Sequence, residues 1–272
     1  MLTQIHHILE KGSGRINEDT LFIGDDIFGV FDGATSLDNV LYDATKTGGM
    51  LASSIACSVF STNCHPLVDL AITANQSIHE KMRFHGVDCT ARERLWSTSA
   101  AVVRTDKNGI EWLQTGDAFI LLIYEDHSYR LLSEKKDHDF DTLSAWKQIA
   151  TKSVLPIHAA LKEQLRQTRC GMNRSYGVLN GEKEAEAFLK TGVESFHDVK
   201  EIILATDGLS MPVEKPEKEK NFDLFVERYL HLGLEGVKDH IREIEKDDPR
   251  CIRYPRFKCH DDIAAISIRA VH

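Results

Sequence analysis

The sequence predicts an α+β fold with antiparallel sheets, and three observations carry that prediction. Short apolar runs rich in β-branched and aromatic residues recur along the chain, two amphipathic helical patterns follow one another without a strand between them, and residues 97–133 then contain several strand patterns in succession. Runs of that length and composition are typical of strands. Because a doubly wound parallel sheet would alternate strand and helix, antiparallel pairing is favoured.

The elements are expected in the following order. Strands are expected over residues 21–23, 27–31, 99–103, around 112–113, and over 119–124, 202–205 and 263–268. Apolar positions at helical spacing predict helices over 44–59 and 67–82, and a helical pattern over 140–165 that Pro156 interrupts. Residues 212–221 form a charged loop with proline, and residues 224–244 are expected to be helical although Gly233 and Gly236 lie inside them. No change of composition marks a boundary, so one domain over 1–272 is expected.

Composition excludes several classes of protein. The chain has 272 residues, 42% of them hydrophobic and 28% charged, and no apolar run is long enough to cross a bilayer. The net charge of −9 argues against a nucleic-acid partner. The amino terminus lacks the pattern of a signal peptide and the six cysteines form no CxxC pair, so a cytoplasmic protein without membrane contact is expected. The sequence leaves the oligomeric state open.

Carboxylates fall at the ends of the expected strands. The five sites are Glu18-Asp19, Asp32, Asp117, Asp207 and Asp261-Asp262. A single Asp-Gly pair is most simply a turn. Five acidic sites at one sheet edge would repel each other unless a cation lay among them. Because the ligands would all be oxygen, with no His or Cys at metal spacing, Mg²⁺ or Mn²⁺ is favoured over zinc or copper. Two such ions can activate water and clamp a phosphoryl group during its displacement.

Seven segments carry a resemblance to a known family. They are RINED (15–19), GVFDG (29–33), STSAAVV (97–103), TGD (115–117), DH (137–138), ATDGL (205–209) and DDIAAI (261–266). In this order they resemble the metal-dependent serine/threonine protein phosphatases of the PP2C (PPM) family, over nearly the whole chain. The resemblance implies a four-layer αββα sandwich, two antiparallel sheets flanked by helices, with a dimetal site at one edge. It also implies a phosphorylated protein as the substrate.

The resemblance also implies roles for particular residues. Asp32 would bridge two ions, Asp207 and Asp261 would complete the site of one, and Glu18 with the Gly33 carbonyl would complete the site of the other. Many members bind a third ion through the residues that correspond to Asp117 and Asp207.

The third ligand of that additional site is Met211 here, a poor ligand for a hard cation, so a third ion is expected to bind weakly at most. Asp262 stands where many members have Asn, and is expected to support the site.

Two departures from the family pattern affect the mechanism. The histidine that follows Asp-Gly in many members is absent after Gly33, so the general acid is a metal-bound water, another group, or none. His260 adjoins Asp261 on an extended segment and should face the other way in a structural role. Arg15 resembles the arginine that holds substrate phosphate, but it precedes Glu18 by three residues where four are usual. On a strand, such a slip reverses the side chain unless a bulge absorbs it.

Three functional hypotheses follow. The leading one is an active phosphatase that uses Mg²⁺ or Mn²⁺ against phosphoserine or phosphothreonine, with Asp32 and Arg15 as catalytic residues. A pseudophosphatase would bind a phosphoprotein without turnover, and a third hypothesis is a hydrolase of small phosphoesters. A basic run over residues 250–258 either contacts a phosphopeptide or is merely solvated.

Overall fold

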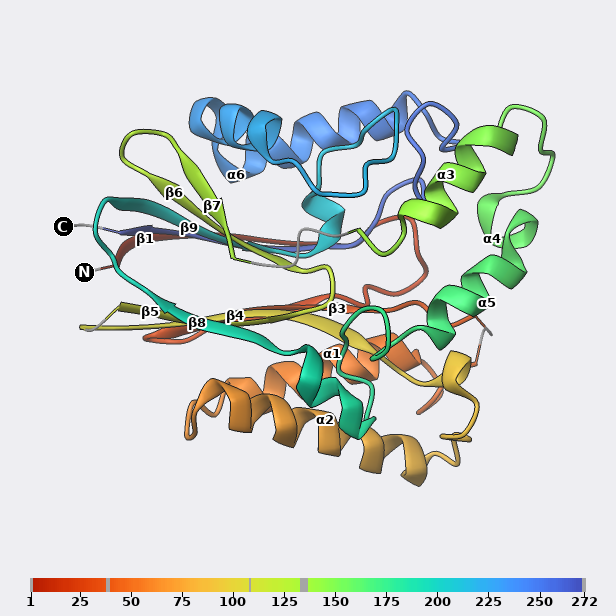
Figure 1. The fold of residues 1–272 in the computed structure, drawn as a ribbon, viewed down its shortest axis with the longest axis horizontal. Coiled ribbons are helices and arrows are strands. Elements are labelled where there is room, and N and C mark those ends of the chain that lie inside the picture. Colours follow the sequence, from red (N-terminus) through yellow and green to blue (C-terminus); the bar gives the residue numbers. More distant parts are fainter. Residues whose placement is uncertain (1, 38–39, 108, 133–136, 271–272) are drawn as a thin grey trace.

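Two five-stranded antiparallel sheets form the central layers of the protein, seen here in a computed structural model that describes residues 2–37, 40–107, 109–132 and 137–270 (Figure 1). The first sheet has the order β1 (Leu2–Glu10), β10 (Ile263–Ala270), β9 (Val199–Ala205), β6 (Phe119–Tyr124) and β7 (Tyr129–Leu131). The second has the order β2 (Thr20–Ile23), β3 (Ile27–Gly33), β4 (Thr98–Asp106), β5 (Gly109–Thr115) and β8 (Lys190–Glu194). The antiparallel pairing confirms the expected fold class.

Helices cover the outer face of each sheet. α1 (Gly48–Phe60) and α2 (Leu67–Phe84) lie on the second sheet, and α6 (Asp223–Lys246) lies on the first, which completes the four-layer αββα arrangement (Figure 1). α3 (Phe140–Ile149), α4 (Ile157–Ala160) and α5 (Lys162–Cys170) stand together at one end of the sandwich. Within the described residues, no helix combines the length and the apolar character needed to cross a bilayer.

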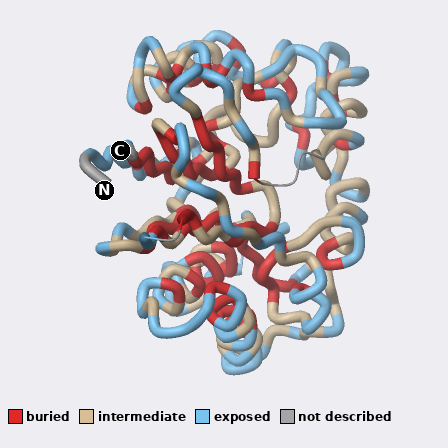
Figure 2. The backbone as a smooth tube through the Cα atoms, turned by 60° about the vertical axis from the view of Figure 1, so that its left-hand side comes forward, coloured by how far each residue is buried: buried red, intermediate tan, exposed pale blue. Residues whose placement is uncertain are grey.

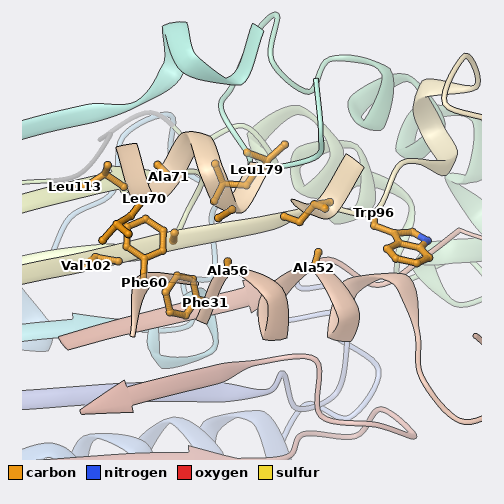
Figure 3. Packing of buried hydrophobic residues seen from close by; sticks show 14 of the residues in the cluster. Phe31, Ala52, Ala56, Phe60, Leu70, Ala71, Trp96, Val102, Leu113 and Leu179 are labelled. Atoms are coloured by element: carbon orange, nitrogen blue, oxygen red, sulfur yellow. The ribbon is translucent and has the colours of Figure 1, made fainter. Parts of the chain in front are cut away.

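Three apolar layers hold the sandwich together. Phe28, Val30 and Leu204 belong to the layer between the two sheets, and each is fully buried. Phe31 and Phe60 belong to the layer between the second sheet and the helices α1 and α2 (Figure 3). A third layer lies under α6. Burying each such side chain contributes roughly 1.5–3 kcal/mol to the free energy of unfolding. Figure 2 shows that the buried residues are concentrated in the interior of the molecule.

Local signals explain where the helices begin and bend. α1 begins at Gly48 rather than near Ala44, because the Thr47 side chain accepts a hydrogen bond from the Met50 N–H and caps the helix. α6 bends at Gly233, whose φ of 68° lies in the left-handed region that glycine adopts without steric cost.

Strand register brings the acidic segments to one edge. Thr20 pairs with Phe31, and Ala205 pairs with both Phe119 and Ala265. The acids that precede or follow these strands therefore gather at the end where α3, α4 and α5 lie, while both chain termini lie at the opposite end (Figure 1).

Candidate active site

A cavity of about 550 Å³ opens at the acidic edge of the two sheets. Asp32, Asp117, Asp207 and Asp261 line it, each delivered by the end of a different strand. α5 and the loop before β10 supply the opposite wall, where Leu165 and Phe257 add apolar surface. The structure thus brings together four of the acids that the sequence singled out.

The electrostatics of these acids are those of a crowded anionic cluster. Burial, reinforced by the charges of Asp19 and Asp207, raises the pKa of Asp32 well above its usual value. Burial, with Asp261 and Asp117 nearby, raises the pKa of Asp207 to about 7. Carboxylates held this close favour either protonation or a bound cation.

Asp19 is one of the acids at the strand ends, but the sequence indicated no individual role for it. Its side chain is 8% exposed, and burial together with Asp261 and Asp207 raises its pKa despite a hydrogen bond from Thr206. Its Oδ2 has no hydrogen-bond partner among the described residues. The signal was present in the register, because the pairing of Thr20 with Phe31 puts Asp19 opposite Asp32 when extended by one residue.

Glu18 lies on the other side of the same segment. Its carboxylate accepts hydrogen bonds from the hydroxyls of Thr35 and of Thr47, the latter at 2.5 Å. A Cβ on Gly49 would stand 2.8 Å from both Glu18 Oε1 and the Gly33 carbonyl carbon, so Glu18 and Gly33 are neighbours across a position that admits only glycine. Glu18 and Gly33 are therefore close in space, and their shared role at a metal ion stays a prediction.

Asp262 acts as a tether. It is 2% exposed, and its two carboxylate oxygens accept hydrogen bonds from the backbone N–H groups of Gly12 (2.7 Å) and Glu18 (3.0 Å). These bonds fix the segment that carries Glu18 and Asp19 against the start of β10. The support that the sequence led us to expect from Asp262 has this form.

Asp117 belongs to a second group of ligand-type side chains. His138 Nε2 lies 3.8 Å from Asp117 Oδ2 and 3.5 Å from Asp139 Oδ2, and the imidazole stacks on Tyr176 at 4.0 Å. One ligand atom from each of these three residues lies within 4.8 Å of the others. Asp139 lines the cavity beside Asp117. Met211 instead packs against the apolar cluster under α6.

The cations of the cavity differ from those expected. Arg15 is exposed, lies in a bend rather than on a strand, and is absent from the residues that line the cavity. The argument from strand register therefore does not apply to it. Arg169 of α5 lines the cavity instead, and its guanidinium donates to the Thr35 carbonyl and to Ser97 Oγ (3.4 Å). Lys162 and Lys258 line the same cavity.

Two histidines line the cavity, His138 and His158. Neither follows Gly33 in the sequence, where Ala34, Thr35 and Ser36 stand. His260 points away from the cavity, as expected, with Nδ1 2.9 Å from Glu245 Oε2.

Both the sequence and the fold of the chain are similar to those of known proteins. A family model described as protein phosphatase 2C matches residues 11–244 of the chain. No curated protein matches the sequence. Solved structures do match. The serine/threonine phosphatase PstP/Ppp of Mycobacterium tuberculosis has a TM-score of 0.60 at 14% identity, with 100% of each chain covered.

Two further solved structures show the same fold. The PPM phosphatase MsPP of Mycobacterium smegmatis, in complex with cacodylate, has a TM-score of 0.60 at 15% identity and 99% coverage of both chains. The catalytic domain of PstP with two manganese ions has a TM-score of 0.59 at 15% identity, covering 100% of this chain and 99% of that one. At these identities the likeness lies in the fold.

Proposed function

The chain belongs to the protein phosphatase 2C family of metal-dependent serine/threonine phosphatases, and from that premise we propose that it hydrolyses phosphoserine and phosphothreonine in proteins at the acidic edge of its sheets. The observation that carries the proposal is the convergence of Asp19, Asp32, Asp207 and Asp261 from separate strand ends. The six cysteines are free, which accords with the cytoplasm as its compartment.

The residues of this edge fit a pair of Mg²⁺ or Mn²⁺ ions. All the donors are oxygens, and Asp19 Oδ2 lacks a hydrogen-bond partner among the described residues. The carboxyl groups of Asp19, Asp32 and Asp207 have raised pKa values. We propose Asp32 as the residue shared by two ions, Asp207 and Asp261 as ligands of one, and Asp19, Glu18 and the Gly33 carbonyl as the oxygens around the other. When bound, such ions supply a water nucleophile and charge stabilisation for in-line phosphoryl displacement.

The chain's own groups bind and orient the substrate. Arg169 presents a planar guanidinium at the cavity wall, suited to the oxygens of a phosphoryl group. We therefore propose Arg169, in place of Arg15, as the arginine that holds substrate phosphate. Leu165, on the same helix as Arg169, and Phe257 add apolar surface to the cavity, which excludes water from one side of the bound phosphoryl group.

A third ion is proposed at Asp117. The sequence suggested a weak site because Met211 replaces a carboxylate, but His138 and Asp139 supply two further ligand atoms from another direction. Imidazole suits Mn²⁺ better than Mg²⁺. The third ion should therefore bind in Mn²⁺ and be weak or absent in Mg²⁺.

The test is hydrolysis of a phosphothreonine peptide and of p-nitrophenyl phosphate, with added Mn²⁺ or Mg²⁺ and with excess EDTA. Activity should require the metal, and Asp32→Asn should lower kcat by roughly a hundredfold or more while the protein remains folded by circular dichroism. Activity that persisted in EDTA, or a normal kcat for Asp32→Asn, would contradict the proposal.

The other two hypotheses predict different results in the same assay. A pseudophosphatase would bind the phosphopeptide without releasing phosphate at any metal concentration. A hydrolase of small phosphoesters would turn over p-nitrophenyl phosphate and leave the peptide intact.

A further inference from the structure

Lys258 brings a positive charge into the acidic side of the cavity. Its Nζ lies 2.7 Å from Oδ1 of Asp261, and its side chain is 19% exposed. Lys258 lines the cavity together with Asp32 and Asp261. A fixed cation stands beside carboxylates that we have assigned to metal ions.

The segment that carries Lys258 is held in place from several directions. Arg256 donates to Asp248 Oδ2 at 3.1 Å and to the Glu245 carbonyl at 2.9 Å. Phe257 packs against the small apolar cluster that includes Trp146. The other two basic residues of this run are also engaged, since Arg253 pairs with Glu214 and Arg250 donates to the Ser153 carbonyl. Of the four, Lys258 is the one that reaches the cavity.

The two carboxylate oxygens of Asp261 have different surroundings. Oδ1 accepts from Lys258 and from the Asp262 N–H at 2.8 Å. Among the described residues, no hydrogen bond reaches Oδ2. Lys258 thus orients the carboxylate through one oxygen and leaves the other directed at whatever cation the cavity binds.

Asp262 gives a reason for an extra positive charge here. It is a buried carboxylate that accepts only backbone hydrogen bonds within the described residues, from Gly12 and Glu18. An asparagine has a single acceptor oxygen and could take only one of these two bonds, so the buried negative charge comes with them. Lys258 contacts the neighbouring Asp261, so its positive charge lies close enough to offset the negative charge of Asp262.

We propose that Lys258 is a positioning residue that sets the charge of the active centre, lowering its affinity for metal ions and raising its affinity for phosphate. The inference rests on the proposed function, because it takes Asp261 to be a metal ligand. A lysine repels a divalent ion that shares its carboxylate partner, and it attracts the phosphate dianion that enters the same cavity. Lys258 thus weakens metal binding and strengthens phosphate binding. A lysine with a purely structural role would not change the two affinities in opposite directions.

The experiment measures both affinities in Lys258→Met. Calorimetric titration with Mn²⁺ should give about tenfold tighter binding than in the wild type, because a nearby like charge has been removed at a partly buried site. At saturating Mn²⁺, inhibition by inorganic phosphate should weaken about tenfold. Lys258→Arg, which keeps the charge, should stay near the wild type in both. Lys81→Met is the matched control. It removes a lysine of the outer helix α2 that pairs with Asp43, and it should change neither the Mn²⁺ affinity nor the inhibition by phosphate.

The outcomes separate this inference from the function it rests on. A wild type that binds no Mn²⁺ would overturn the proposed function. A wild type that binds Mn²⁺, together with a folded Lys258→Met that binds it equally or more weakly, would overturn the role of Lys258 alone. If Lys258→Met melts well below the wild type, Lys258→Gln tests the same loss of charge with a polar side chain.

Discussion

The crowded carboxylates should destabilise the protein when no cation neutralises them. The loss of folding stability can be measured through the ionisation of Asp207. Burial, with Asp261 and Asp117 nearby, raises the pKa of Asp207 from an ordinary 3.8 to about 7. Between these values the folded protein keeps a proton that the unfolded chain has released. In chelator, the stability contributed by this group is therefore lost as the pH rises from about 4 to about 7, and it stays lost above that window.

The size of the effect follows from the same shift. A difference of about 3 pKa units corresponds to about 4 kcal/mol of lost stability at about pH 8. Asp207→Asn keeps the shape of the side chain and removes its charge. In EDTA at about pH 8 the variant should therefore melt higher than the wild type, by up to roughly 8 °C for a domain of this size. In Mn²⁺ the order should reverse, because the wild type gains more from the ion.

Thermal melts between about pH 5 and 9, with EDTA and with Mn²⁺, test this reasoning. Asp141→Asn is the matched control, since the Asp141 side chain is exposed on α3 outside the cavity. Its melting profile should follow the wild type. The reasoning is refuted if Asp207→Asn melts lower than the wild type in EDTA at about pH 8, or if the two lose stability equally as the pH rises.

Three further predictions follow from the site. Asp19→Asn should lower kcat/KM and Mn²⁺ affinity by roughly tenfold more than Glu18→Gln, because Asp19 faces the cavity acids and Glu18 is held by two hydroxyls; equal losses would contradict the division. Arg169→Ala should weaken phosphate inhibition about tenfold and Arg15→Ala should leave it unchanged, and the opposite ranking would restore the arginine expected from sequence. Asp139→Asn should remove a weak third Mn²⁺ from the calorimetric titration and leave two tight ions, whereas loss of a tight ion would reject the third site.

Much of the fold was readable because buried strands and acidic strand ends are local signals. β3 is an apolar run that ends in Asp32-Gly33, β9 is one that Asp207-Gly208 follows after a single residue, and both were expected. β1 was missed because its polar residues and paired histidines do not resemble a core strand, and its partner β10 lies at the other end of the chain. β8 was missed because it is a short, mostly exposed edge strand whose pairing with β5 is set by tertiary contacts.

The site was readable in its acids and not in its cations. An acid that ends one strand and an acid that precedes its antiparallel neighbour lie at the same sheet edge, so Asp32, Asp207 and Asp261 needed only the pattern. Whether Glu18 or Asp19 faces the cavity depends on the register of β2 with β3, which the sequence does not state. Arg169 could not be found because a helix far along the chain presents it, and its position depends on how that helix packs.

The pairing of the first and last strands has a consequence for engineering the chain. Leu2 pairs with Ala270, so the two ends of the backbone meet at the end of the sandwich away from the cavity (Figure 1). A short linker could join them, and the chain could be reopened in the exposed loop over 213–215. Such a circular permutant would keep every strand neighbour and every cavity residue. Its new ends would lie beside α6, where a fused reporter domain could be attached directly next to the catalytic edge.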